Sequence, residues 1–146
     1  MRKIIIFSDG GAIKNPGPAA AAFLFCNERK GIFKKFSKYI GEKTNNEAEY
    51  EAAILALLHL KKFLGKKLAR VTEVELRSDS ELLVNQMEGK YKILDKKLQP
   101  LFLKLWNLKL DFKKVKFKLI SRKKNKEADK LVRETLSSLD KKPSID

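Results

Sequence analysis

Four carboxylates stand in settings where an acidic side chain could do chemistry rather than only face solvent. Two directly follow apolar runs that are typical of strands, and two lie within the first turns of predicted helices. The protein as a whole is strongly basic, with a net charge of +15 at pH 7. A cluster of acids in a basic protein is explained if the acids hold divalent metal ions while the basic surface binds phosphate. The four are Asp9, Glu49, Asp79 and Asp129.

Each acid taken alone also has an ordinary structural interpretation. Asp9 could be a turn residue before two glycines, and Glu49 could be a first-turn acid favoured by the helix dipole. Asp79 could cap a short helix. Asp129 could pair with Arg133 four residues later, which is worth only about 0.3–0.5 kcal/mol. Four such coincidences in one chain are harder to accept than a single shared site.

Hydrophobic periodicity predicts the elements that must position these acids. Apolar runs and alternation indicate strands over residues 4–7, 20–26, 32–40, 71–77 and 115–119, the third being an edge strand. Helical patterns follow over residues 44–64, 78–87, 94–108 and 125–139. The first helix starts with the capping box Thr44-Asn-Asn-Glu47, and Asn125 is expected to cap the last. The order βββαβααβα predicts an α/β fold, a mixed five-stranded sheet with three antiparallel strands, then two parallel ones, and helices on both faces.

Composition limits the remaining possibilities. A chain of 146 residues with 43% apolar residues predicts one domain, over residues 1–140, followed by a loose tail over 141–146. The single Cys26 excludes an internal disulfide and fits a cytoplasmic location, and one Cys with one His excludes a zinc signature. The apolar run near the N-terminus is too short for a signal peptide or a membrane span. We expect no membrane association, a monomer, and no obligatory protein partner.

The basic residues are concentrated in one part of the chain. Residues 61–126 contain 20 Lys and Arg against 7 Asp and Glu. This block predicts a polyanionic partner such as nucleic acid, the alternative being a solvated lysine-rich surface.

The motifs around the four acids, taken together, resemble those of the ribonuclease H family (type 1). The resemblance runs from Ile4 to about Leu139, nearly the whole domain. Any one motif is weak evidence, but four in the right order and on the right elements are specific. They are Asp9-Gly-Gly-Ala-Ile-Lys-Asn-Pro-Gly-Pro18, Thr44-Asn-Asn-Glu-Ala-Glu49, Ser78-Asp79-Ser80 and Asn125-Lys-Glu-Ala-Asp129-Lys-Leu.

The resemblance implies an endoribonuclease that hydrolyses the RNA strand of RNA/DNA hybrids and leaves 5′-phosphate and 3′-hydroxyl ends. It implies two divalent ions about 3.5–4 Å apart, which activate a water and stabilise the leaving oxygen. Asp9 would bridge both ions, Glu49 and Asp79 would hold the ion on the nucleophile side, and Asp129 the other. Oxygen ligands suit Mg²⁺, with Mn²⁺ able to substitute. Without metal, the packed carboxylates should repel one another and have raised pKa values.

The resemblance also implies which side chains bind the hybrid. The two glycines would allow the RNA strand to approach the backbone, three asparagines match positions that touch bases or sugars, and Thr44 matches a residue that binds a DNA-strand phosphate. The predicted substrate-binding residues are Gly10, Gly11, Asn15, Thr44, Asn45, Asn46, Asn85, Lys90, Lys92, Lys96, Lys97, Arg122 and Lys124.

The chain departs from many family members in two places. The segment between the third and fourth acids is short and lacks an extra helix with a basic handle, so the four lysines over residues 90–97 are expected to substitute in part. The loop before Asp129 has no histidine, and Arg122 or Lys124 could cover that role. The only histidine, His59, is interpreted as a packing residue. Two alternatives stay open: a non-catalytic module of this fold that binds hybrid or double-stranded RNA, and another nuclease or transposase of the same fold superclass.

Overall fold

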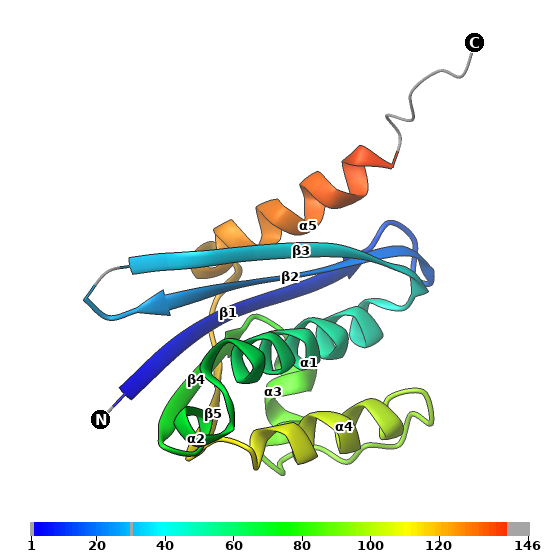
Figure 1. Cartoon of the computed structure of the whole chain (residues 1–146). Coiled ribbons are helices and arrows are strands. Elements are labelled where there is room, and N and C mark those ends of the chain that lie inside the picture. The colour runs from blue at the N-terminus through cyan, green and yellow to red at the C-terminus, as the bar shows by residue number, and fades with distance from the viewer. Residues whose placement is uncertain (1, 30, 140–146) are drawn as a thin grey trace.

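A mixed five-stranded sheet in the order β3-β2-β1-β4-β5 forms the centre of the computed structural model, which describes residues 2–29 and 31–139 (Figure 1). The strands are β1 (Arg2–Ala12), β2 (Gly17–Asn27), β3 (Gly31–Lys43), β4 (Thr72–Ser78) and β5 (Lys114–Leu119). The helices are α1 (Asn45–Leu64), α2 (Lys66–Arg70), α3 (Glu81–Met87), α4 (Gln99–Lys109), the 3-10 helix η1 (Arg122–Asn125) and α5 (Lys126–Ser138).

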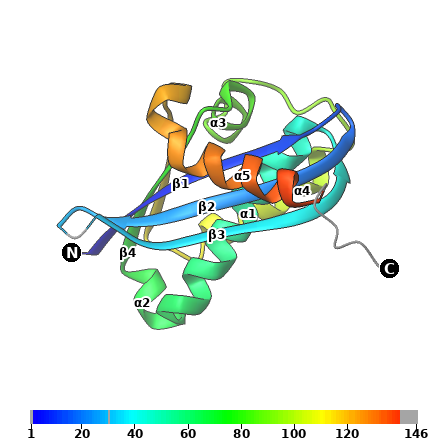
Figure 2. The same cartoon turned by 90° about the horizontal axis from the view of Figure 1, so that it is seen from above.

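The sheet topology confirms the predicted fold class. β1, β2 and β3 pair antiparallel, and β4 and β5 are added parallel to β1. Helix α1 packs on one face of the sheet and is covered in turn by α4, while α5 lies across β1, β2 and β3 on the opposite face (Figures 1 and 2). β3 lies at one edge of the sheet, as its mixed aromatic and lysine composition predicts.

Strand β1 is longer than its apolar run, and this changes the setting of the first acid. Antiparallel pairing with β2 continues to Ala12, whereas parallel pairing with β4 stops at Phe7. Asp9 lies opposite Ala22 within the β1–β2 ladder, so its interpretation as a turn residue is wrong. The sequence pattern missed this extension because the glycines and small residues that follow Asp9 carry no apolar periodicity.

Two local predictions about helices are also corrected. The five-residue helix α2 was not expected. Leu94 was expected to begin the leucine-striped helix, but it is 77% exposed, and α4 starts only at Gln99. Pro100 explains the later start, because proline has no backbone N–H to donate within a helix and is favoured in the first turn.

The main core lies between the sheet and α1. Ile4 and Ile6 of β1 are buried there with Tyr50, Ile54 and Leu57 of α1. The predicted tail over residues 141–146 lies outside the described residues. None of the helices in the described part of the chain has the length and apolarity to cross a bilayer.

Candidate active site

The second acid is positioned by a close contact between β1 and α1. A side chain at Gly10 would overlap the backbone carbonyl of Ala48, so only glycine lets the strand come this near to the helix. At this contact the Gly10 N–H donates a hydrogen bond to Oε1 of Glu49 over 2.7 Å. Gly10 therefore allows the β1 backbone to lie close to α1. This contact places the Glu49 side chain beside β1, the strand that carries Asp9.

The third acid follows β4, and it does not cap α3. Ser80 occupies the cap position, where its Oγ accepts a hydrogen bond from the Leu83 N–H over 3.2 Å. The interpretation of Asp79 as the helix cap is therefore wrong. Its carboxylate instead accepts a hydrogen bond at Oδ2 from the side-chain amide of Asn125 over 3.2 Å.

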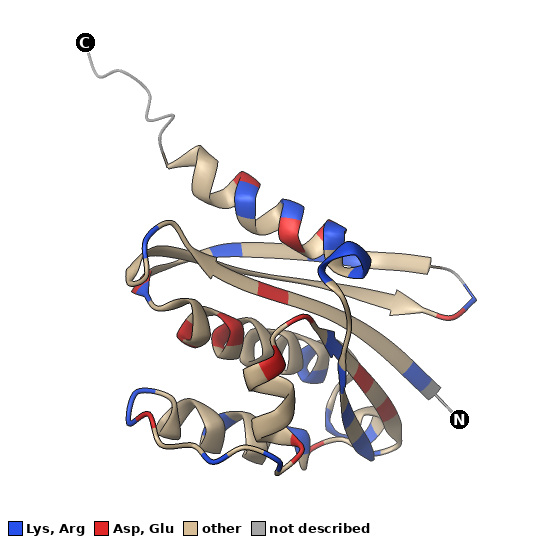
Figure 3. Ribbon diagram, turned by 180° about the vertical axis from the view of Figure 1, so that it is seen from behind, with Lys and Arg blue, Asp and Glu red and all other residues tan. Residues whose placement is uncertain are grey.

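Three carboxylates lie close together where β1, the start of α1 and the end of β4 meet. One oxygen each from Asp9, Glu49 and Asp79 lies within 4.8 Å of the others. Asp9 is 7% exposed and Glu49 is 8% exposed, so two of the three are largely removed from water. Figure 3 shows acidic positions in red on β1, on α1 and near the start of α3, which are neighbouring elements. An all-oxygen donor set of this kind fits Mg²⁺ or Mn²⁺.

The electrostatics of the cluster favour a bound cation. Burial, followed by the charges of Asp79 and Asp129, raises the pKa of Asp9 to about 8. Burial, then the charges of Asp9 and Asp79, raises the pKa of Glu49 well above its usual range. The Gly10 N–H and the charge of Arg122 oppose both increases. A divalent ion bound between these carboxylates would offset their mutual repulsion and would compete with protons for them.

Asp129 lies in the same cleft but in a different local setting. The cleft has a volume of about 510 Å³, and all four predicted acids line it. Oδ2 of Asp129 accepts a hydrogen bond from Nε of Arg133 over 2.9 Å, and the Asp129 side chain is 48% exposed. The predicted pair with Arg133 is therefore observed. The charge of Asp129 nevertheless acts on Asp9, so the fourth acid lies near the first.

Several predicted substrate-binding residues also lie in or beside this cleft. Asn45 accepts a hydrogen bond at Oδ1 from the Ala12 N–H over 2.8 Å, and its own N–H donates to Oδ1 of Asn15 over 3.0 Å. These bonds join the turn after β1 to the start of α1. The predicted capping box of Thr44 and Glu47 is confirmed. The residues of the predicted set that line the cleft are Gly10, Gly11, Asn45, Asn46 and Arg122.

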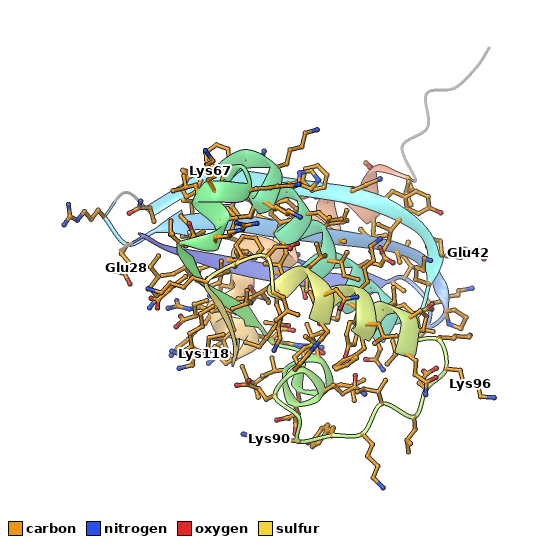
Figure 4. All side chains as sticks on the ribbon, turned by 60° about the horizontal axis from the view of Figure 1, so that its bottom comes forward. Glu28, Glu42, Lys67, Lys90, Lys96 and Lys118 are labelled. Atoms are coloured by element: carbon orange, nitrogen blue, oxygen red, sulfur yellow. The ribbon has the colours of Figure 1, made fainter. Side chains whose placement is uncertain are left out.

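Other members of the predicted set lie outside the cleft lining. Asn85 is on α3, and Lys124 lines a separate pocket on the sheet face with Phe7 and Leu24. The four predicted lysines are exposed on the segment between α3 and α4, where Figure 4 shows Lys90 and Lys96 pointing outward. The four are Lys90, Lys92, Lys96 and Lys97.

His59 has the expected packing role. Its ring lies 4.4 Å from that of Phe36 and 5.2 Å from that of Phe23, between centroids. It lies on α1 and is absent from the lining of the acidic cleft.

Sequence analysis missed the part that Asn125 plays in this site. It was expected to cap the last helix, and it does occupy the cap position of α5, but its side chain makes no capping hydrogen bond. It bonds instead to the Ser8 carbonyl oxygen and to Asp79, which are 117 and 46 residues away in the chain. No local pattern signals contacts over such separations.

The chain is similar to known proteins in both sequence and fold. Residues 7–135 match the family model described as "Reverse transcriptase-like". The chain is 31% identical over 134 residues to ribonuclease HI of Halobacterium salinarum, covering 92% of this chain and 64% of that protein. It is also 31% identical over 137 residues to a bifunctional protein of Mycobacterium tuberculosis, of which it covers 36%. The chain thus spans between about a third and two thirds of these curated relatives.

The chain also aligns with solved structures over almost their whole length. LC11-RNase H1, isolated from compost by a metagenomic approach, has been solved in complex with an RNA/DNA hybrid. That structure is 44% identical, with a TM-score of 0.87, and the alignment covers 93% of this chain and 98% of the other. The ribonuclease H1 structure from Halobacterium salinarum is 31% identical, with a TM-score of 0.86 and the same coverage.

Proposed function

Because this chain belongs to the type 1 ribonuclease H family, we propose that it is an endoribonuclease that hydrolyses the RNA strand of RNA/DNA hybrids. The observation that carries the proposal is the convergence of Asp9, Glu49 and Asp79 within 4.8 Å in one cleft. The solved relative that holds an RNA/DNA hybrid supports this choice of substrate. We further propose that the products carry 5′-phosphate and 3′-hydroxyl ends and that the protein acts in the cytoplasm, where a reduced Cys26 is expected.

The acids would hold two Mg²⁺ ions, with Mn²⁺ as a substitute. When bound, such ions supply Lewis-acid activation of the attacking water and stabilisation of the leaving oxygen. Asp9 would contact both ions, Glu49 and Asp79 the ion on the nucleophile side, and Asp129 the other. For that last role Asp129 has its second oxygen available beside the bond to Arg133, and its side chain is 48% exposed. The Gly10 N–H holds Glu49 in place without adding a charge that would compete with a cation.

Substrate would approach along the rim of the cleft. Asn45 and Asn46 lie at the start of α1 and line the cleft, so their polar groups can face the sugar edge of a bound strand. Thr44 uses its oxygen as an acceptor in the capping box, which leaves its hydroxyl proton for a backbone phosphate. Arg122 lines the cleft on the side of η1 and can contact the phosphates of the strand being cut. Gly11, Asn15 and Asn85 complete the proposed contacts.

A cleavage assay tests this function. The purified chain is incubated with a hybrid whose RNA and DNA strands carry different labels, with Mg²⁺, with Mn²⁺ and with EDTA. We expect internal cuts in the RNA strand only, dependent on a divalent ion, with ends that a 5′-phosphate-dependent exonuclease accepts. Equal cutting of the DNA strand, or full activity in EDTA, would contradict the proposal. Tight hybrid binding without cleavage would favour a non-catalytic module.

A further inference from the structure

The buried amide of Asn125 connects three elements that carry acids of the cleft. Asn125 is 1% exposed and lies at the junction of η1 and α5. Its Nδ2 donates one hydrogen bond to the carbonyl oxygen of Ser8 on β1 over 2.9 Å and another to Oδ2 of Asp79 over 3.2 Å. Ser8 immediately precedes Asp9, and Asp129 follows Asn125 by four residues on α5.

From this geometry we infer that Asn125 is a positioning residue: it orients the carboxylate of Asp79 for the metal ion and fixes the start of α5 relative to β1. The inference rests on the proposed function, because it assigns Asn125 a role through a proposed metal ligand. One neutral side chain thereby relates the positions of Asp9, Asp79 and Asp129, while Glu49 is set separately by the Gly10 N–H.

The chemistry of an amide suits this position. A carboxylate has about four acceptor sites, so a hydrogen bond at Oδ2 fixes its rotation and leaves capacity for an ion. A lysine or arginine donor would bring a positive charge next to the ion, whereas an amide brings none. Losing a hydrogen-bond partner of a metal ligand typically costs about 10–100-fold in metal affinity or activity.

The unpaired end of the same side chain supports a functional reason for the amide. Among the described residues, Asn125 Oδ1 and Ser8 Oγ are buried without a hydrogen-bond partner. A flipped amide would place Oδ1 against a carbonyl and a carboxylate, so the donor assignment is secure. Burying Oδ1 without a partner costs about 1–3 kcal/mol, and an apolar side chain would avoid this cost. Only a side chain with a donor, however, can make the two hydrogen bonds to Ser8 and Asp79.

The test measures Mn²⁺ binding by titration calorimetry without nucleic acid, together with thermal stability and single-turnover cleavage. Asn125→Ala should weaken Mn²⁺ binding about 10–100-fold and slow cleavage at limiting metal, with partial recovery at high Mn²⁺. Asn125→Asp, which is nearly isosteric but sets a carboxylate against Asp79, should be at least as impaired. Asn125→Ser retains one donor and provides a milder variant if the alanine protein does not fold; its binding should also be measurably weaker.

A matched control separates positioning from simple stabilisation. Gln86 is another buried amide, bonded to the Tyr50 hydroxyl and the Lys92 carbonyl oxygen, and it does not line the cleft. Gln86→Ala should lower the melting temperature but leave Mn²⁺ affinity unchanged. A purely structural Asn125 would behave in the same way.

A double-mutant cycle identifies the residue through which Asn125 acts. In an Asp79→Asn background, Asn125→Ala should weaken Mn²⁺ binding by a clearly smaller factor than in the parent, because the carboxylate that it orients is already gone and only its hold on α5 remains. An unchanged affinity in the single variant, or the same fold-loss in both backgrounds, would overturn the inference. If the parent protein itself binds no Mn²⁺, both the proposed function and this inference fail. If the parent binds and cleaves while Asn125→Ala matches it, only this inference fails.

Discussion

Three of the four acids differ in what holds each carboxylate in place. Glu49 accepts a backbone N–H from Gly10, Asp79 accepts the amide of Asn125, and Asp129 pairs with the exposed guanidinium of Arg133. The first two bonds come from neutral donors, so they orient an acid without offsetting the negative charge that attracts a cation. The third comes from an exposed, charged partner that a bound ion can displace.

Asp79→Asn tests the chemical role of the third acid. We expect turnover to fall by more than the ~10–100-fold that loss of a ligand's hydrogen-bond partner costs, since here the ligand itself is lost. Metal-free stability should stay equal or increase, because one negative charge leaves a repelling cluster. Steady-state cleavage and chemical unfolding measure the two effects. Ser80→Ala removes the true cap and should instead destabilise the fold by about 1 kcal/mol. Unchanged turnover in Asp79→Asn would exclude the metal-ligand role.

Glu75 predicts a pH dependence of folding that is separate from the active site. Burial alone would raise the pKa of Glu75, but the hydrogen bond and charge of Arg77, with Lys3 and Lys118, hold that pKa below its usual range. A carboxylate with a depressed pKa stabilises the fold above its unfolded pKa, and this contribution disappears as acid protonates the group. Glu75→Gln should therefore lose ~1–2 kcal/mol near pH 7.

Urea unfolding at a series of pH values checks this assignment. The difference between the parent and Glu75→Gln should begin to shrink as the pH falls below the usual glutamate pKa, and it should disappear once the pH is below the depressed pKa of the folded carboxylate. A difference that stays constant down to pH 3 would show that the ion pair with Arg77 contributes nothing to stability.

At the scale of elements, the contact between β1 and α1 decides the geometry of the cleft. Gly10→Ala forces a methyl group onto the Ala48 carbonyl, so we expect a loss of about 1–3 kcal/mol or more and a displaced Glu49. Gly11→Ala is the matched control, because its added methyl group would lie 3.6 Å from Val132 Cγ1, an ordinary contact. Unfolding free energies and Mn²⁺ affinity of both variants report the two effects. If Gly10→Ala and Gly11→Ala had equal unfolding free energies, α1 could move away from β1 at no cost in stability.

The segment between α3 and α4 offers a test of substrate binding. If Lys90, Lys92, Lys96 and Lys97 contact the backbone of the DNA strand, neutralising all four to Gln should reduce the slope of log affinity against log salt. The reduction should be roughly 0.7–0.9 per lysine. Hybrid binding should weaken several-fold at moderate salt, while single-turnover cleavage at saturation stays nearly constant, because these lysines position substrate and do no chemistry.

Four lysines on β3, at the end of α1 and on α2 provide a control with the same change in net charge. Lys38, Lys62, Lys66 and Lys67 are exposed and lie away from the acidic cleft. Changing these four to Gln should leave the salt slope nearly as it is. If both quadruple variants lose the same slope, the effect is one of net charge, and the binding surface lies elsewhere.

At the scale of the whole molecule, a site with repelling acids should link metal binding to folding. Ions that bind only the folded chain stabilise it by about 2.7 kcal/mol at a concentration 100 times the Kd. For a domain of this size that corresponds to a rise in Tm of roughly 5–10 °C. Thermal unfolding with Mg²⁺, reversed by EDTA, measures the shift. Asp9→Asn should show a much smaller rise, and an equal rise would place the stabilising ion outside the cleft.

The sequence alone was sufficient for the fold class and for the order of the acid-bearing elements. Apolar alternation and helical periodicity are local properties, so they predicted the antiparallel meander, the buried α1 and its capping box. The same local logic misjudged β1 after Asp9, where small residues conceal the strand, and Leu94, where Pro100 moves the helix start. It also offered Asp79 as the cap of the short helix α3, whereas Ser80 takes that position in the structure.

Only the tertiary structure decided which side chains meet. The overlap that makes Gly10 necessary is with Ala48 of α1, and the amide of Asn125 spans 117 and 46 residues to reach Ser8 and Asp79. The high pKa of Asp9 likewise arises from burial and from the charges of Asp79, which follows β4, and Asp129 on α5. These are properties of distances between elements, and a linear chain contains no record of such distances until burial of the apolar faces brings the elements together.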